Sequence, residues 1–156
     1  MKYLLLCSLL FLSSCEPHAG NIISEKLAIA QLNKFFEQID VDSFADINWS
    51  EIVTQDFRVF EAGKEMDLEG FIKFATPSAD LLETNWAISD PVVTLDTNTA
   101  HISYFNDGFF RHGNQEVKIK WMESVLMVLE DDSLKLKFLN SNLLERDVIN
   151  MIEESS

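Results

Sequence analysis

The chain has 156 residues, of which 47% are hydrophobic and 24% charged, a composition typical of one folded domain and not of a disordered segment. Its 26 acidic and 12 basic residues give a formal net charge of -14. Phosphate binding requires a basic face, and no Lys or Arg residues cluster into one, so nucleic acid is excluded as a partner. The acidic side chains are expected to form a solvated surface that keeps the domain soluble.

The first fifteen residues, MKYLLLCSLLFLSSC, are typical of a signal peptide. One basic residue, Lys2, precedes the apolar run 4–12, and two small serines follow. This run is too short to span a bilayer as a helix. Residues 12–15 (LSSC) resemble the lipobox of bacterial lipoproteins, in which the cysteine is diacylated and becomes the mature N-terminus. The alternative is an ordinary secretory signal with an incidental cysteine.

The lipobox resemblance predicts a signal peptide over residues 1–14, lipidation at Cys15 and a tether that extends to residue 23. The lipid bilayer of a bacterial cell envelope is then the first expected partner, reached through acyl chains and not through the acidic body. Glu16 stands where an Asp retains many lipoproteins of enteric bacteria in the inner membrane. The predicted location is therefore the outer membrane, facing the periplasm. With its one mature cysteine lipidated, the chain has no internal disulfide.

Hydrophobic periodicity divides residues 24–146 into helices followed by strands. Helical spacing predicts helices over 24–39 with Ser24 as N-cap, over 43–53, and over 68–75 with Asp67 as N-cap. Alternation predicts strands over 57–60, 86–95, 99–111, 116–130 and 133–144. This order predicts an α+β domain with helices against one face of a curved antiparallel sheet. Residues 147–156 are expected to be an acidic segment outside the domain.

Short turns allow the side chains on each sheet face to be assigned by counting. A two-residue turn at 131–132 places Glu123 opposite Asn140, and a turn at 112–115 places Tyr104 opposite Glu123. One face then has a polar end and an apolar end. The polar end consists of Tyr104, Asn106, Trp121, Glu123, Asn140 and Asn142, and the apolar end of Ala100, Ile102, Val125, Met127, Leu136 and Phe138.

Four features together resemble the nuclear transport factor 2-like superfamily, especially its SnoaL-like bacterial members, over residues 24–146. They are the segments FFEQIDVDSFADI, QDFRVFEAGKEMDLEGFIKF and WMESVLMVLEDDSLKLKFLNSN, and the Ala-x-Ile-x-Tyr strand 100–104. The resemblance implies a cone-shaped curved antiparallel sheet wrapped around N-terminal helices, with a pocket at the open end. The family includes isomerases, dehydratases, polyketide cyclases and members without known activity, so the fold does not determine the function.

The predicted ligand pocket contains Tyr104, Trp121, Glu123, Phe138, Asn140, Asn142 and, near its mouth, Asp56. Glu123 is the one candidate for a catalytic base. The favoured interpretation is structural, with Glu123 hydrogen-bonded to Tyr104 and Asn140, because an unpaired buried carboxylate is costly. Family dehydratases and cyclases often carry a pocket histidine, which counting does not find here. No cofactor is expected, and no metal site, since one lipidated cysteine and three scattered histidines do not form a ligand set.

Two functions follow from these observations. The first is an envelope-anchored lipoprotein that binds a small, partly apolar ligand or acts as an interaction module, without catalysis. The alternative is a SnoaL-like enzyme that uses Glu123 for proton transfer of the isomerase, dehydratase or cyclase type. A homodimer through the outer sheet face is also predicted, because an apolar patch on a soluble domain needs cover; the C-terminal segment 143–156 is the alternative cover. The patch consists of Phe105, Met122, Leu126, Val128 and Leu139.

Overall fold

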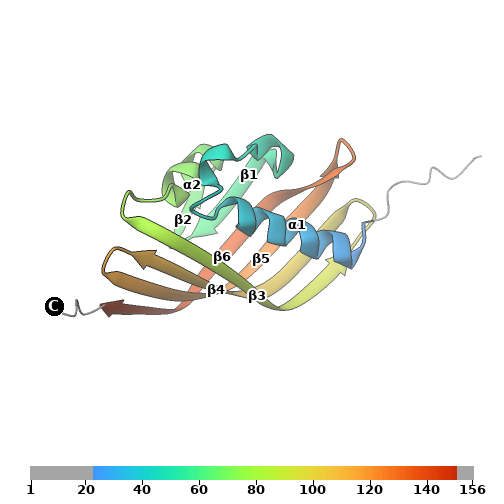
Figure 1. Ribbon diagram of the computed structural model, residues 1–156. Helices are drawn as coiled ribbons and strands as arrows, with labels where there is room; N and C mark the ends of the chain where they lie inside the picture. Colours follow the sequence, from blue (N-terminus) through green and yellow to red (C-terminus); the bar gives the residue numbers. More distant parts are fainter. Residues whose placement is uncertain (1–22, 151–156) are drawn as a thin grey trace, which may run out of the picture.

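The computed structural model describes residues 23–150, which form one curved six-stranded sheet with the helices on one of its faces (Figure 1). The helices are α1 (Glu25–Gln38), the 3-10 helices η1 (Phe44–Asp46) and η2 (Trp49–Glu51), and α2 (Leu68–Ala75). The strands are β1 (Val53–Glu61), β2 (Lys64–Met66), β3 (Leu81–Leu95), β4 (Thr99–His112), β5 (Gln115–Glu130) and β6 (Ser133–Asn150). The predicted signal peptide, Cys15 and the tether up to residue 22 lie outside the described residues, as do residues 151–156. Within residues 23–150, no helix has the length and apolar character needed to cross a membrane.

The predicted α+β architecture is confirmed, with one difference in the sheet. Its strand order is β2-β1-β6-β5-β4-β3, and β3 to β6 form the expected antiparallel meander. The last strand of the meander, β6, returns beside β1 and runs parallel to it. The sheet is therefore mixed, and its one parallel pair joins segments that are far apart in the sequence.

The helix predictions were right at α1 and α2 and wrong between them. Ser24 caps α1 by accepting a hydrogen bond from the Leu27 N–H at 3.2 Å, and Asp67 caps α2 in the same way. The predicted helix over 43–53 is absent, and two 3-10 turns stand in its place. The Ile52 carbonyl already accepts a hydrogen bond from the Leu136 N–H at 2.9 Å, so the chain joins the sheet before a helix can complete.

The turn prediction at residues 131–132 is also confirmed. Asp131 and Asp132 have φ values of 50° and 61°, the left-handed pair that a two-residue hairpin turn requires. Ala62 and Gly63 have φ values of 52° and 72° and connect β1 to β2 in the same manner. Strand β2 was not predicted, because a segment of three residues has too few positions to show alternation.

The predicted pairing between β4 and β5 is confirmed along its length, with Tyr104 opposite Glu123 and Asn106 opposite Trp121. The predicted pairing between β5 and β6 is wrong beyond Met127. Met127 stands opposite Leu136 and Leu126 opposite Phe138, so Lys137 is the extra residue of a bulge. A shift by one residue moves the side chains that follow it to the other face, as far as a second register shift opposite Lys120 and Trp121 of β5.

The bulge exchanges the residues on the two faces of β6. Leu139 and Ser141 point inward and are buried, whereas Phe138 and Asn140 are only partly buried on the outer face. Ser141, not Asn140, stands opposite Glu123. Lys137 itself points outward, and its ammonium group binds the Asp56 carboxylate on β1. The predicted outer-face position of Leu139 is wrong for the same reason.

The core lies between the helices and the concave face of the sheet. Phe35 of α1 is fully buried, and its ring contacts Phe36, Phe57 of β1 and Phe71 of α2 at centroid distances of 5.2 to 6.5 Å. Burial of each such ring stabilises the fold by about 1.5 to 3 kcal/mol. These rings pack α1 and α2 against the sheet, and Phe35, Phe36 and Phe71 also line the cavity described below.

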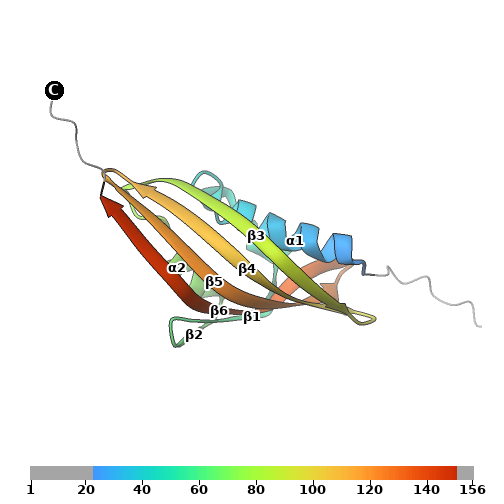
Figure 2. The same cartoon turned by 90° about the horizontal axis from the view of Figure 1, so that it is seen from below.

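Strand β6 continues to Asn150, four residues beyond the predicted domain end at 146, and pairs with β5 as far as Gln115. Residues 142–150 are exposed along this extension. As far as Asn150, the C-terminal segment therefore extends the sheet and does not cover its outer face. Figure 2 shows this outer face without a helix over it.

Candidate functional site

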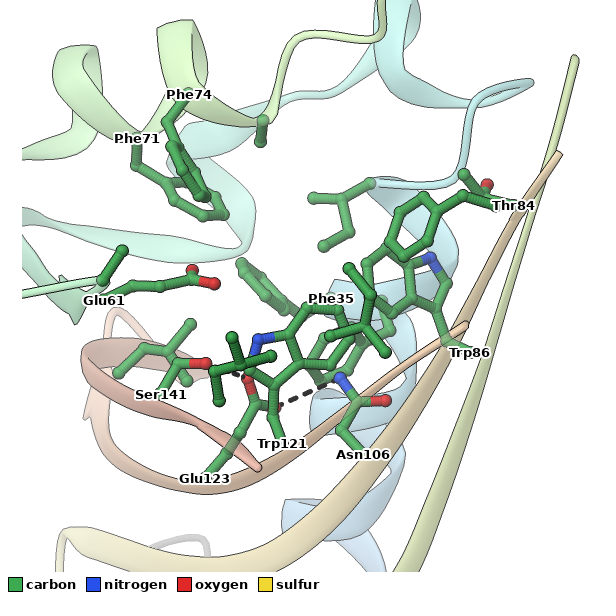
Figure 3. Close-up of a pocket in the computed structure, with 18 of the residues that line it drawn as sticks. Phe35, Glu61, Phe71, Phe74, Thr84, Trp86, Asn106, Trp121, Glu123 and Ser141 are labelled. Atoms are coloured by element: carbon green, nitrogen blue, oxygen red, sulfur yellow. Dashed lines mark hydrogen bonds between the residues drawn. The ribbon is translucent and has the colours of Figure 1, made fainter. Parts of the chain in front are cut away.

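A cavity of about 610 Å³ opens between α1, α2 and the concave face of the sheet. Aromatic side chains dominate its walls (Figure 3). They are Phe35 and Phe36 from α1, Phe71 and Phe74 from α2, Trp86 from β3, Phe110 from β4 and Trp121 from β5. The volume lies within the range of roughly 300 to 1,000 Å³ that small-molecule sites usually have.

Glu123 lies at the floor of this cavity and is 6% exposed. Its Oε1 accepts a hydrogen bond from the Ser141 hydroxyl at 2.8 Å, and its Oε2 accepts one from the Asn106 amide at 3.1 Å (Figure 3). Burial raises the pKa of the Glu123 carboxyl group, and these two hydrogen bonds oppose part of that rise. Both oxygens of Glu123 are therefore held by the protein itself.

Tyr104 stands opposite Glu123 and is 2% exposed. Its hydroxyl group is close enough to the Glu123 carboxylate for the two groups to affect each other's pKa. The pKa of Tyr104 is raised mainly by burial and secondly by the charge of Glu123. The geometry between them does not make a hydrogen bond, so the Tyr104 hydroxyl has no partner among the described residues. Tyr104 does not line the cavity.

A second carboxylate, Glu61, enters the cavity from the end of β1. Glu61 pairs with Ser141 across the parallel strands, and Ser141 pairs with Glu123 on its other side. The pKa of Glu61 is raised to about 7, mainly by burial and secondly by the charge of Glu123. A hydrogen bond from the Trp121 indole N–H opposes part of that rise. The sequence alone does not identify Glu61 as a site residue, because its position depends on the parallel pairing of β1 with β6.

Two buried polar atoms of the cavity wall have no hydrogen-bond partner among the described residues. They are Asn106 Oδ1, an acceptor, and Trp86 Nε1, a donor. Asn106 is 1% exposed, and its amide nitrogen is already used by Glu123. A buried polar atom without a partner costs free energy, so both atoms are places where a bound molecule would be stabilised.

The structure brings together only part of the predicted pocket. Trp121, Glu123 and Asn142 line the cavity. Phe138 and Asn140 face away from it because of the bulge at Lys137.

Asp56 also lies outside the cavity lining. It is exposed beside the register shift in β1 and accepts hydrogen bonds from Thr54 and Lys137. The bond from Lys137 is the first cause of its lowered pKa.

The chemistry available at the cavity is that of two carboxylates. Among residues 23–150, no three His, Cys, Asp or Glu side chains come together in a way that could hold a metal ion. His101 is exposed on the outer face, and His112 lies at the end of β4 beside Asp80. Glu61 and Glu123 are therefore the groups through which the cavity can exchange a proton or bind a positive charge.

Comparison with known proteins relies on structure, since no family model and no curated protein matches this sequence. An NTF2-like protein from Cytophaga hutchinsonii superimposes with a TM-score of 0.62 and 12% identity, over 78% of this chain and 100% of its own. The protein has a nuclear transport factor 2-like fold.

Two further structures with this fold differ in kind. The hexachlorocyclohexane dehydrochlorinase LinA-type3 from Novosphingobium barchaimii has a TM-score of 0.67 and 11% identity over 84% of this chain and 93% of its own. A CaMKII hub homology domain from Chlamydomonas reinhardtii has a TM-score of 0.64 and 13% identity, over 77% of this chain and 98% of its own.

At these low identities, the superpositions establish the fold of this chain and nothing finer. One of the similar structures is named as an enzyme and another as a hub domain. The function must therefore be argued from the cavity itself.

Proposed function

We propose that this protein is an envelope-anchored lipoprotein whose nuclear transport factor 2-like domain binds a small, partly apolar ligand without catalysis. The observation that carries the proposal is the cavity of about 610 Å³, with aromatic walls and a polar floor at Glu123 and Asn106. Apolar walls with a few convergent polar groups are the usual composition of a ligand site. The envelope anchor is supported by residues 12–15 alone, which resemble a lipobox.

The surroundings of Glu123 favour binding over catalysis by this residue. A general base must approach the proton that it removes with a free oxygen. Both Glu123 oxygens instead accept hydrogen bonds from Asn106 and Ser141, and the residue is nearly inaccessible. The arrangement supports a structural role for Glu123 as an anchor of the cavity floor.

One observation favours the second candidate function, a proton-transfer enzyme of the SnoaL-like type. Glu61 lines the same cavity, and its pKa of about 7 lies near the pH at which a general base works best. In this alternative the general base is Glu61 and not Glu123. It predicts that Glu61→Gln binds a substrate normally but does not convert it.

Titration with Nile red, a neutral apolar dye, tests the binding function. The expected result is a saturable rise in fluorescence at one dye per chain. Ala75→Trp, which fills the cavity from the end of α2, should abolish the rise. Ala87→Trp, at an exposed position of β3 outside this cavity, is the matched control and should leave it unchanged. Absence of dye binding to the unmodified protein, or equal binding to the Ala75→Trp variant, would contradict the proposal.

A further inference from the structure

The free hydrogen-bonding capacity at the floor of the cavity consists of acceptors, whereas a free donor, Trp86 Nε1, lies in the wall. Ionised Glu61 and Glu123 can only accept hydrogen bonds. The side-chain amide nitrogen of Asn106 donates to Glu123, and no group donates to Asn106 Oδ1. Asn106 is only 1% exposed. Figure 3 shows this amide beside Glu123 and shows Glu61 approaching from the other side. A molecule that fits this floor must bring N–H or O–H donors.

The floor also carries negative charge without a counter-ion. None of the ion pairs within residues 23–150 includes Glu61 or Glu123. Arg146 of β6 is the other charged residue that lines the cavity, and it is exposed at the far end of its strand. Lys64 of β2 pairs with Glu61 in the hairpin but is exposed and does not line the cavity. Helices α1 and α2 and strands β3 and β4 contribute no charged side chain to the lining.

Aromatic rings stand beside these carboxylates. Trp86, Phe110 and Trp121 form a cluster with centroid distances of 5.3, 6.1 and 6.3 Å. The face of an aromatic ring attracts a cation, and the attraction increases when the cation is desolvated. Aromatic faces next to unpaired carboxylates form an environment suited to an ammonium group attached to an apolar body.

We infer that the ligand is an organic cation, a small apolar molecule with a protonated amine that Glu61 and Asn106 Oδ1 hold at the cavity floor, beside the charge of Glu123. This inference rests on the proposed binding function and specifies the chemical class of the ligand. The amine supplies the missing donors and the missing positive charge together. The aromatic walls bury the apolar body.

Binding of a cation should be linked to the protonation of Glu61. Its pKa lies near 7 in the empty cavity because of burial and the nearby charge of Glu123. A bound ammonium group favours the ionised carboxylate and lowers that pKa. Binding near pH 7 therefore releases a proton. Below pH 7 the amine must compete with the proton on Glu61, and its affinity falls.

Three compounds with one apolar body test the inference: 4-phenylbutylamine, 4-phenylbutanol and 4-phenylbutyrate. Isothermal titration calorimetry at pH 8 should show the amine binding roughly tenfold or more tightly than the alcohol, and the carboxylate not binding. From pH 8 to pH 6 the affinity for the amine should fall by up to about tenfold, whereas that for the alcohol should not change. Titrations at pH 7 in two buffers of different ionisation enthalpy should show net proton release.

Glu61→Gln and Glu123→Gln should each remove most of the preference for the amine over the alcohol. Glu69→Gln, an exposed change on α2 outside the cavity, lowers the net negative charge equally and should leave the preference intact. An amine that binds no more tightly than the alcohol, in a protein that still binds Nile red, would overturn the inference and leave the binding function standing. Persistence of the preference in both Gln variants would also overturn it. Absence of binding by all three compounds and by Nile red would overturn both proposals.

Discussion

Glu61 and Glu123 both pair with Ser141, from the two strands that flank β6. Two strand spacings separate their backbones by roughly 10 Å, a distance that two glutamate side chains can bridge from opposite sides. The bulge at Lys137 creates this arrangement, because it turns Ser141 toward the cavity. The two carboxylates therefore titrate as neighbours in a mostly apolar cavity.

The substitution Glu61→Gln is expected to stabilise the fold at alkaline pH. Glu61 has an ordinary pKa of 4.5 in the unfolded chain and about 7 in the folded protein, so the folded state holds its proton more tightly. The free energy of unfolding then falls as the pH rises from about 4.5 through 7. The full difference is worth at most ~3 kcal/mol, and ~1 to 2 kcal/mol is expected because the carboxyl group is partly exposed.

Urea unfolding at two pH values measures this effect. The Gln variant should exceed the unmodified protein in free energy of unfolding at pH 8 and equal it at pH 4, where Glu61 is protonated in both states. Glu69→Gln should show no such difference. A Gln variant that is less stable at pH 8 would mean that Glu61 is a solvated or ion-paired carboxylate.

Two substitutions at Glu123 separate its hydrogen bonding from its charge. Glu123→Gln keeps the shape of the side chain and most of its bonds to Asn106 and Ser141, so the free energy of unfolding should change by less than about 1.5 kcal/mol. Glu123→Ala leaves these buried donors without an acceptor and should cost roughly 1 to 3 kcal/mol. Chemical denaturation gives both values. An Ala variant as stable as the Gln variant would show that the donors find water or other partners.

The pairing of β4 with β5 could be predicted from the sequence because their turn is short and neither strand contains an irregularity. That pairing placed Tyr104 beside Glu123 and Asn106 beside Trp121 correctly. The bulge at Lys137 could not be predicted in the same way. Phe138 and Leu139 are adjacent and both apolar, so the pattern after Leu136 fits either face, and the sequence does not show which of the two points inward.

The other half of the site depends on contacts that are remote in sequence. Glu61 precedes an Ala-Gly turn, where a solvated glutamate is common. It becomes a cavity residue only because β6 returns parallel to β1. The predicted helix over 43–53 failed for a similar reason: local spacing favoured a helix, but the sheet captures the chain at Ile52. Long-range pairing overrides local preference at both positions.

Lipidation at Cys15 remains a prediction that labelling can test. Cells grown with a palmitate analogue should incorporate label into the unmodified protein and into Cys7→Ala, because Cys7 leaves with the signal peptide. Cys15→Ala should lose the label and accumulate as an unprocessed precursor. Equal incorporation in both variants would contradict the lipobox interpretation.

A homodimer through the outer sheet face also remains a prediction, but one residue of the predicted apolar patch is replaced by another. Leu139 is buried inside, and Phe138 takes its place on this face beside Phe60, at a ring distance of 5.4 Å. Met122, 48% exposed, lies on the same face. Light scattering of the chain without its signal peptide at micromolar concentration should give twice the monomer mass. Met122→Lys should give the monomer mass, whereas Asn114→Lys, in the exposed turn after β4, should not.

Native mass spectrometry of the protein released from its own envelope can detect a natural ligand, since it weighs the folded chain with whatever its cavity holds. We expect a species heavier than the lipidated chain by one small molecule, which is lost on denaturation and is absent from the Ala75→Trp variant. The released molecule should carry an amine. A folded protein found only at the mass of the lipidated chain, which also fails to bind Nile red, would contradict the claim that this cavity is a ligand site.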